Sequence, residues 1–392
     1  MKKYGLIISA LILIFSFCIT SFAINDTKNE AEYNISKTEF DVDCKSAILI
    51  DARTGTVLYE KNINEMYSPA SVTKIMTILL VMEALEDGRI ALDDMVNVSS
   101  YAASMGGSQV FLEEGEAISV DELLKCTIIA SANDASVALA EHVTGSEEAF
   151  IVKMNERAAE LGMKNTVFKN ATGLDDTEEN LTSALDIAIM SRELISHQKV
   201  LEYSSLWQDT IRGGEFTLTN TNRLVRYYDG CNGLKTGSTS KAGFCMSATA
   251  KRTNMQLIAV VMGAPTRDTR NSIARSLLDY GFANYTLYEA PGGELESIPV
   301  LGGCTQSAPV YSKEFSALVN KSDISRVELK YSIPEKITAP LNAEDVVGKI
   351  EFFISGKLLG ASDIYVNEQI PKIDFTEVYK RVIALTIFGK KS

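Results

Sequence analysis

Histidine is scarce in this chain: only His142 and His197 occur among its 392 residues. A Ser-His-Asp triad would have to use one of these two residues, and neither stands in the sequence context of a triad. Histidine and cysteine also do not cluster at the spacing of zinc ligands. We therefore expect a structural or surface role for both histidines, and any catalysis must use other side chains.

The cysteines are few and dispersed. Of the six, Cys18 lies in an N-terminal segment that we expect to be removed, and the five that remain are an odd number. An odd count argues against a disulfide scaffold, although one or two bridges stay open. Cys126 and Cys245 lie in apolar segments and are expected to be small core residues. The others are Cys44, Cys231 and Cys304.

Positive charge is also in short supply. Lysine and arginine total 38 against 51 acidic residues, which gives a net charge of −13. Loss of Lys2 and Lys3 with the N-terminal segment would make the charge −15. A surface of this sign repels phosphate backbones, so we expect no nucleic acid as partner.

Long apolar runs are rare, and the N-terminal one has the layout of an export signal. Lys2 and Lys3 precede an apolar stretch over residues 6–17, and a small-x-small cleavage site follows at Ser21-Phe22-Ala23. This pattern predicts a secretory signal peptide over 1–23 and an exported protein. An uncleaved anchor stays open as the alternative, although the run is short for a membrane span.

The rest of the chain is long enough for two domains. A polar linker is expected over 24–44, followed by a catalytic domain over 45–289. Its patterns predict a hairpin over 46–60, helices near 71–86, 119–130, 134–144, 147–161 and 267–280, and strands at 216–220, 243–251 and 255–263. Strands at both ends with helices between them indicate an α/β (α+β) fold, an antiparallel sheet flanked by helices.

The C-terminal part has a different character. Alternating runs at 327–331 and 350–354 predict a small all-β domain over 290–372. A tail over 373–392 places apolar residues at helical spacing, which are Phe375, Val378, Tyr379, Val382, Ile383 and Ile387. This amphipathic helix is too short to span a bilayer, and we expect it to lie on one; an ordinary docking helix stays open.

Three short motifs occur in a fixed order: Ser71-Val72-Thr73-Lys74, Ser131-Ala132-Asn133 and Lys235-Thr236-Gly237. Pro69 and the apolar run that follows place Ser71 in the first turn of a helix, so Lys74 lies on the same face. The second motif falls in a loop between two helices, and the third is expected to open an edge strand. Each motif is weak alone, but together they indicate acyl transfer without histidine.

With these motifs and the phrases around them, the chain resembles the low-molecular-weight penicillin-binding D-alanyl-D-alanine carboxypeptidases, most closely their sporulation-associated branch. The resemblance runs from about Ser46 to the C-terminus and includes Gly233-Leu234 before the third motif and Asn220-Thr221-Asn222 upstream. It departs at Asn180, where the family usually has a histidine; we interpret that histidine as structural or peripheral.

The resemblance implies a role for each motif. Ser71 would attack the bond between the two terminal D-alanines of a peptidoglycan stem peptide, with Lys74 as base and Ser131 as proton relay. The residues implied to bind substrate are Asn133, Lys235, Thr236, Gly237 and Ser238, and the backbone N–H groups of Ser71 and Ser238 would form the oxyanion hole. No metal or organic cofactor is implied. β-Lactam antibiotics would be covalent inhibitors, and the C-terminal helix would attach the enzyme to the outer face of the cytoplasmic membrane.

Two alternatives stay open. A class A-like serine β-lactamase shares the three motifs but needs a glutamate to activate the deacylating water. Glu178 and Glu179 lie in the plausible region without the accompanying Leu-Asn pattern. A non-catalytic penicillin-binding or wall-binding module is the other, but binding alone would not need Lys74.

Overall fold

The computed structural model describes residues 33, 41–174 and 180–388. The predicted signal peptide and most of the predicted linker lie outside these residues. Tyr33, within the linker, contacts the C-terminal domain: its backbone N–H donates to the Leu358 carbonyl at 2.9 Å, and its hydroxyl donates to Asp323 at 3.0 Å.

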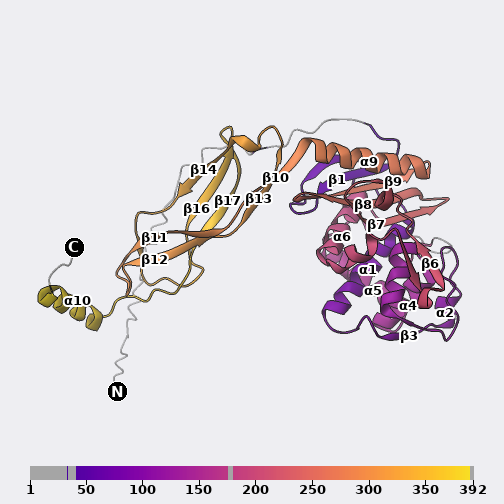
Figure 1. The fold of residues 1–392 in the computed structure, drawn as a ribbon, viewed down its shortest axis with the longest axis horizontal. Helices are drawn as coiled ribbons and strands as arrows, with labels where there is room; N and C mark the ends of the chain where they lie inside the picture. The colour runs from indigo at the N-terminus through magenta and orange to yellow at the C-terminus, as the bar shows by residue number, and fades with distance from the viewer. Residues whose placement is uncertain (1–32, 34–40, 175–179, 389–392) are drawn as a thin grey trace, which may run out of the picture.

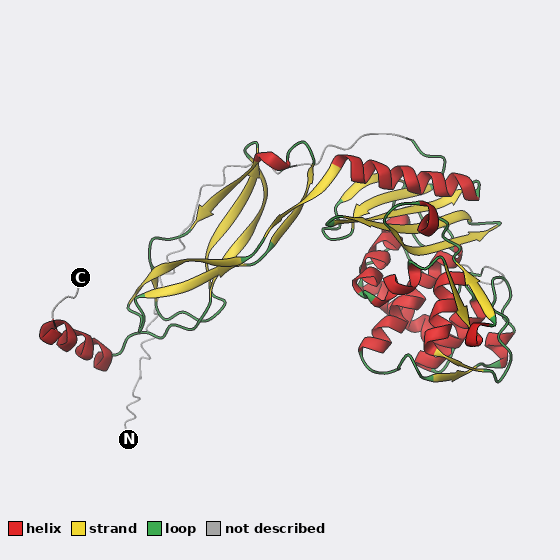
Figure 2. Cartoon of the chain, in the orientation of Figure 1, coloured by secondary structure: helices red, strands yellow, loops and turns green. Residues whose placement is uncertain are grey.

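A five-stranded antiparallel sheet organises the first domain. Its order is β2-β1-β9-β8-β7, formed by Val57–Lys61, Ser46–Asp51, Met255–Ala264, Gly243–Arg252 and Cys231–Thr239. The long helix α9 (Arg267–Asn284) covers one face, and a lobe of helices covers the other (Figures 1 and 2). Two apolar cores result, one on each side of the sheet. The predicted sheet flanked by helices is confirmed.

The helical lobe is built around α1 (Lys74–Glu86), whose side chains are buried over most of its circumference. A 3-10 turn, η1 (Ala70–Thr73), leads into it. The other helices of the lobe are α2 (Ser100–Ala103), α3 (Val120–Lys125), the π-helical turn η2 (Cys126–Ala130), α4 (Asn133–Thr144), α5 (Glu147–Glu160), α6 (Ala184–Ser196) and α7 (Lys199–Ser204). The four helices predicted in this region are confirmed, whereas the patterns did not predict α6 and α7.

Short elements complete the domain around the lobe. Strands β3 (Met95–Asn97) and β4 (Ala117–Ser119) pair with each other, as do β5 (Gln208–Ile211) and β6 (Phe216–Thr219). The 3-10 turn η3 (Arg212–Gly214) joins the second pair, and α8 (Leu224–Tyr227) precedes β7.

The C-terminal domain is all-β, as predicted. Its six-stranded sheet has the order β14-β16-β17-β12-β11-β15, and β10 pairs separately with β13. Phe315 stacks on Phe352 in its core, with ring centroids 4.0 Å apart. The bounds are β10 (Tyr285–Ala290), β11 (Gly293–Leu301), β12 (Ser307–Ser312), β13 (Phe315–Asn320), η4 (Ile324–Arg326), β14 (Val327–Ser332), β15 (Ile337–Thr338), β16 (Val346–Ile354) and β17 (Lys357–Val366).

Polar contacts join the two domains at one end of the sheet. Arg53, in the turn between β1 and β2, pairs with Glu289 and Glu314, and the Asn254 amide donates to Glu289 at 2.7 Å. The tail helix α10 (Phe375–Phe388) lies at the end of the β domain that is remote from the helical lobe (Figure 1). Of the helices in the described part of the chain, none combines the length and apolarity needed to cross a bilayer.

Candidate active site

Ser71 and Lys74 meet where the chain enters the central helix. Ser71 lies in the 3-10 turn η1 and Lys74 is the first residue of α1, so the predicted helical spacing holds, although the first turn is tighter than an α-helix. In a 3-10 turn, side chains three residues apart eclipse each other. The Lys74 Nζ accordingly lies 3.1 Å from the Ser71 Oγ.

Lys74 is fully buried and has no carboxylate partner among the described residues. Its Nζ donates to the Asn133 Oδ1 at 2.6 Å and to the backbone carbonyl of Thr172 at 2.7 Å. Burial holds the pKa of Lys74 well below its usual value; the nearby charge of Lys235 lowers it further, and Asp134 offsets part of the effect. Burial of this kind makes the neutral amine easier to reach than it is for an exposed lysine.

The second motif faces the first from the start of α4. Ser131 adopts a left-handed conformation (φ 64°) at the end of the π-helical turn, in the loop that was predicted. Asn133 begins α4 and bridges two elements, because its Oδ1 accepts from Lys74 while its Nδ2 donates to the Gly106 carbonyl at 2.6 Å. Asp134, the next residue of α4, accepts hydrogen bonds from the backbone N–H groups of Val110 and Leu112 and so fixes this end of the helix.

Lys235 joins the third motif to the second. Its Nζ donates to the Ser131 Oγ at 2.6 Å and to the Thr236 carbonyl at 3.1 Å. The side chain is only 1% exposed, and burial, followed by the charge of Arg270, lowers the pKa of Lys235 to about 7. The motif lies on the edge strand β7 as predicted, but it does not open that strand, which begins at Cys231.

Gly237 allows β7 to approach the nucleophile closely. A Cβ at this position would lie 2.7 Å from the Pro69 carbonyl oxygen and 2.8 Å from the Ser71 nitrogen. Contacts this short would force the backbone apart. The glycine therefore holds the strand against η1 and keeps Ser238, the next residue, beside Ser71.

The three motifs converge on a cleft of about 430 Å³. Ser71, Ser131, Thr236, Gly237 and Ser238 line it, together with Ser108, Trp207, Thr219, Asn220, Thr221, Arg223, Arg267 and Arg270. Asn133, Lys74 and Lys235 contact these groups from behind. The structure thus brings together all eight residues predicted to form the site.

Three further contributors were missed by sequence reasoning. Thr172 holds Lys74 through a backbone carbonyl, which leaves no signature in the side chain. Thr221 accepts a 2.8 Å hydrogen bond from Thr236. Arg270, 3% exposed on α9, lies beyond the third motif and perturbs Lys235. The Asn220-Thr221-Asn222 phrase and the arginine-rich start of α9 were the available signals.

Asn180 occupies a structural position behind the serine–lysine pair. It is buried; its Oδ1 accepts from the Lys169 and Asn170 backbone N–H groups at 2.6 and 3.1 Å, and its Nδ2 donates to the Thr73 Oγ1 at 2.9 Å. Asn180 therefore ties the loop that carries Thr172 to the turn that carries Ser71. It touches neither reactive side chain.

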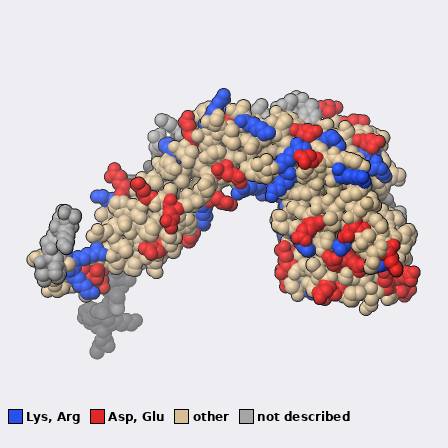
Figure 3. Space-filling model, in the orientation of Figure 1, with Lys and Arg blue, Asp and Glu red and all other residues tan. Residues whose placement is uncertain are grey.

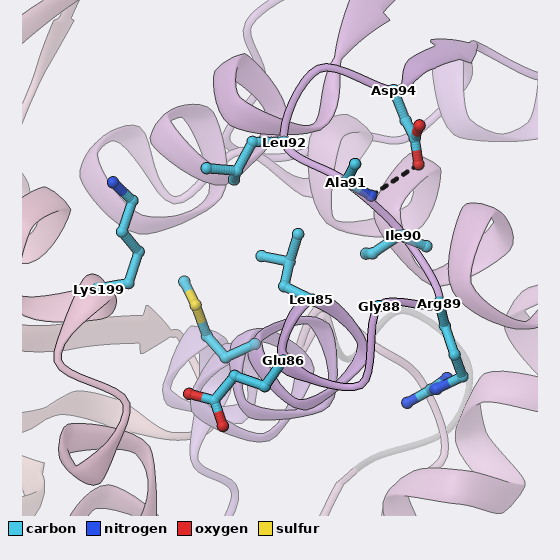
Figure 4. A pocket seen from close by; sticks show the side chains of 10 residues that line it. Leu85, Glu86, Gly88, Arg89, Ile90, Ala91, Leu92, Asp94 and Lys199 are labelled. Carbon is cyan, nitrogen blue, oxygen red and sulfur yellow. Dashed lines mark hydrogen bonds between the residues drawn. The ribbon is translucent and has the colours of Figure 1, made fainter.

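A second hollow lacks the means for this chemistry. It measures about 660 Å³ and lies at the C-terminal end of α1, the end remote from Ser71 (Figure 4). Apolar residues such as Leu85 and Leu92 line it, with Glu86, Arg89 and Lys199 at the rim and Asp94 turned back to the Ala91 N–H. A serine–lysine pair is absent from this lining.

One group in the described residues has the spacing of metal ligands, formed by Glu83, Glu193 and His197. Arg157 already donates to both carboxylates, at 2.8 and 2.7 Å. The carboxylates are thus neutralised by an arginine, and the group lies apart from the cleft. It offers no support for a metal-assisted reaction at Ser71.

The fold and the cleft define a class. A helical lobe against an antiparallel sheet, with serine, lysine and hydroxyl groups meeting at an edge strand, is the arrangement of a serine acyl-transfer enzyme that works without histidine. Residues 32–266 match the D-alanyl-D-alanine carboxypeptidase family, Peptidase S11, and residues 282–372 match the C-terminal domain of penicillin-binding protein 5. The chain belongs to this carboxypeptidase family and is a serine-type D-alanyl-D-alanine carboxypeptidase.

Relatives extend the match over nearly the whole chain. The D-alanyl-D-alanine carboxypeptidase DacF of Bacillus subtilis is 40% identical over 380 residues, 95% of each chain. The crystal structure of penicillin-binding protein 5 from Haemophilus influenzae superposes with a TM-score of 0.77 at 31% identity, covering 86% of this chain and all of that one. Penicillin-binding protein D2 of Listeria monocytogenes in its ampicillin-bound form has a TM-score of 0.58 at 31% identity, covering 63% of this chain and all of that one.

These comparisons favour the carboxypeptidase over both alternatives. DacF of Bacillus subtilis and DacC of Escherichia coli are both named D-alanyl-D-alanine carboxypeptidases, and the match includes the C-terminal β domain. Glu178 and Glu179, on which the β-lactamase alternative relied, lie outside the described residues.

Proposed function

We propose that this enzyme removes the terminal D-alanine from peptidoglycan stem pentapeptides through an acyl-enzyme on Ser71, with neutral Lys74 as the base. The observation that carries the proposal is the environment of the Lys74 Nζ. A neutral amine has two N–H groups and one lone pair. Two of its three partners are carbonyl oxygens that only accept, of Asn133 and Thr172, and the third is the Ser71 hydroxyl, which can donate.

Acylation then follows from the contacts. Lys74 takes the Ser71 proton as the Oγ attacks the carbonyl of the penultimate D-alanine, and the new C–O bond replaces the C–N bond to the terminal residue. The departing amine needs a proton, and Ser131 is placed to relay it. Because Lys235 donates to the Ser131 Oγ, the Ser131 hydroxyl hydrogen is left free to point toward the leaving group.

Substrate binding and charge stabilisation use the edge strand. The terminal carboxylate would lie at Thr236, backed by the positive charges of Lys235 and Arg270, while Asn133 hydrogen-bonds the peptide. The N–H groups of Ser71 and Ser238, brought together by Gly237, would form the oxyanion hole. Losing one such donor typically costs a hundredfold or more.

Water then attacks the acyl-enzyme, releases the shortened peptide and restores the Ser71 hydroxyl. A β-lactam presents a strained amide to the same serine, so we expect it to acylate Ser71. The Listeria relative, solved in ampicillin-bound and cefotaxime-bound forms, supports this extension.

Incubation with a stem pentapeptide ending in D-Ala-D-Ala tests the proposal. We expect free D-alanine from the native enzyme and none above background from Ser71→Ala, together with a mass increase of one penicillin on the native chain alone. Release by Ser71→Ala at the native rate would disprove the assigned nucleophile.

We also propose that the enzyme is exported and rests on the outer face of the cytoplasmic membrane. The N-terminal sequence supports export, and α10 supports attachment because Phe375, Tyr379 and Val382 on it are 83%, 60% and 54% exposed beside the cation Lys380. Sedimentation with anionic vesicles should retain the native chain and lose a variant ending at Asp374. The sporulation role implied by the resemblance stays a prediction, tested by the timing of expression.

A further inference from the structure

The cleft carries more positive charge than a single carboxylate requires. Arg223, Arg267 and Arg270 line it, Lys235 lies just behind, and its described lining includes no aspartate or glutamate. The whole chain has a net charge of −13. In Figure 3 the acidic side chains gather over the helical lobe, while basic ones are more frequent along the sheet layer and at the junction of the domains.

The three arginines differ in what they do. Arg270 is 3% exposed and held in place, because its guanidinium donates to the Asn271 Oδ1 at 2.9 Å and to the Cys245 carbonyl at 3.4 Å. Arg223 and Arg267 are exposed at the mouth, and their side chains make no hydrogen bond or ion pair with any described residue. Arg270 is thus part of the built site, whereas Arg223 and Arg267 are cations without a partner.

Their positions follow the path of a substrate. Ser238 lies opposite Phe244 on β8, and Phe244 lies opposite Ala264 on β9, three residues before Arg267. Arg267, the first residue of α9, is therefore at the end of the sheet where β7 leaves the cleft. Arg223 follows the segment of Asn220 and Thr221 on the same lining. A peptide held along β7 would lie in the cleft that both cations line.

We propose that Arg223 and Arg267 bind a second carboxylate of the stem peptide, upstream of the scissile bond. This inference rests on the function proposed above. Stem peptides offer two such groups: the α-carboxylate of the γ-linked D-glutamate and, where the third residue is diaminopimelate, its side-chain carboxylate. Consecutive residues are about 3.4 Å apart in an extended chain, so both lie within roughly 10 Å of the terminal residue. The enzyme should then prefer peptides in which this carboxylate is free.

The test compares kcat/KM for D-alanine release by the full-length enzyme in detergent. One substrate is the pentapeptide with diaminopimelate, a second has its side-chain carboxylate amidated, and a third has the D-glutamate α-carboxylate amidated. For an exposed charge-assisted contact we expect amidation of the recognised carboxylate to lower kcat/KM about tenfold. The arm that shows the loss identifies which carboxylate is bound.

The variants Arg223→Gln and Arg267→Gln should lose about the same factor on the free-acid peptide and nothing further on the sensitive amide. Arg275→Gln provides a matched control on α9, because Arg275 is exposed, lies outside the cleft lining and donates only to the Tyr227 carbonyl. Equal rates on all three substrates would overturn the inference. So would an equal loss on acid and amide, which would indicate general attraction of the terminal carboxylate. Failure of the proposed function would look different, with no D-alanine released from any peptide.

Discussion

Lys313 in the C-terminal domain and the two lysines of the catalytic cleft lie in opposite environments. In the C-terminal domain, Lys313 is exposed and pairs with Glu344 at 3.2 Å, and that contact raises the pKa of Lys313. In the catalytic domain, Lys74 and Lys235 are buried with no carboxylate partner in the part of the chain that the structure describes, and burial lowers the pKa of both. The same kind of side chain is a surface cation at Lys313 and a buried proton acceptor or hydrogen-bond donor at Lys74 and Lys235.

This difference shows that the buried lysines of the cleft lower the stability of the folded chain. A buried lysine must shed its proton or remain charged in a medium that solvates it poorly, and either state costs free energy. No structural need of the fold explains two such residues within one cleft. The burial of Lys74 is explained by chemistry, because a neutral amine can take the proton of the Ser71 hydroxyl.

The largest expected effect comes from removing the proposed base. Lys74→Met should keep the apolar stem, lose the lone pair and slow acylation by penicillin about 10³-fold or more, because the serine then has no base. Lys313→Met is the control from the C-terminal domain, and penicillin should acylate it at the native rate. If penicillin acylates Lys74→Met at a rate within tenfold of the native rate, and circular dichroism shows that both variants are folded, the account is contradicted.

Lys235→Met separates function from stability. We expect kcat/KM to fall about a hundredfold, since Ser131 loses its donor, and stability at pH 7 to rise. The sign follows from proton binding: with a folded pKa of about 7 against an ordinary 10.5, the unfolded chain binds more protons between these values. Lys235 therefore lowers native stability most at and below pH 7, and the deficit fades toward pH 10.5.

Thermal unfolding of native enzyme and Lys235→Met across pH 6 to 10 measures that deficit. The free energy of unfolding of Lys235→Met should exceed that of the native enzyme by a few kcal/mol at most, since one pKa unit corresponds to about 1.4 kcal/mol. A variant less stable than native at pH 7, or a gain that grows with pH, would show that Lys235 is not held by an unfavourable burial.

Gly237→Ala tests the close approach of β7 to η1. A Cβ would lie under 3 Å from backbone atoms of Pro69, Ser71 and Val72, so we expect a loss of about 1–3 kcal/mol and at least a tenfold fall in acylation rate. Gly293→Ala is matched in the β domain, where nothing lies within 4 Å of the added Cβ. Equal unfolding midpoints for the two variants would argue against the packing described.

The smallest effect on chemistry is expected at Asn180. Asn180→Ala removes a buried amide that ties the Lys169–Asn170 backbone to Thr73, and should lower the free energy of unfolding by about 1–3 kcal/mol. The acylation rate at a temperature where the variant is folded should change only a few-fold. Asn254→Ala, which removes an exposed amide at the domain junction, is the comparison. A hundredfold loss of acylation would instead place Asn180 in the catalytic machinery.

Much of the catalytic site could be predicted because its parts are local in sequence. Ser71 and Lys74 share one turn, and Ser131 and Asn133 are two residues apart where η2 ends and α4 begins. Lys235 was predicted to open an edge strand because it precedes the predicted strands at 243–251 and 255–263. Pairing with β8 over its whole length carries β7 back to Cys231.

The parts of the site and fold that were not predicted depend mainly on contacts between distant segments. Thr172, 98 residues from Lys74 in the sequence, binds the lysine through its backbone carbonyl. A backbone contact of this kind cannot be predicted from the residue type. Helix α6 was missed although Ser183 caps it by accepting the Asp186 N–H, a signal that the sequence does contain. Arg223 and Arg267 resemble ordinary surface charges until the fold places both on one cleft.

The central claim is that Lys74 is neutral when Ser71 attacks. Its most direct test is the pH dependence of the second-order rate of acylation by a β-lactam whose own charge is constant over the range. Because the base must be unprotonated, the rate falls as pH drops through the folded pKa of Lys74. The account predicts that this fall is centred well below 10.5, the ordinary value for lysine. A rate that still rises tenfold per pH unit up to about pH 10 would contradict it.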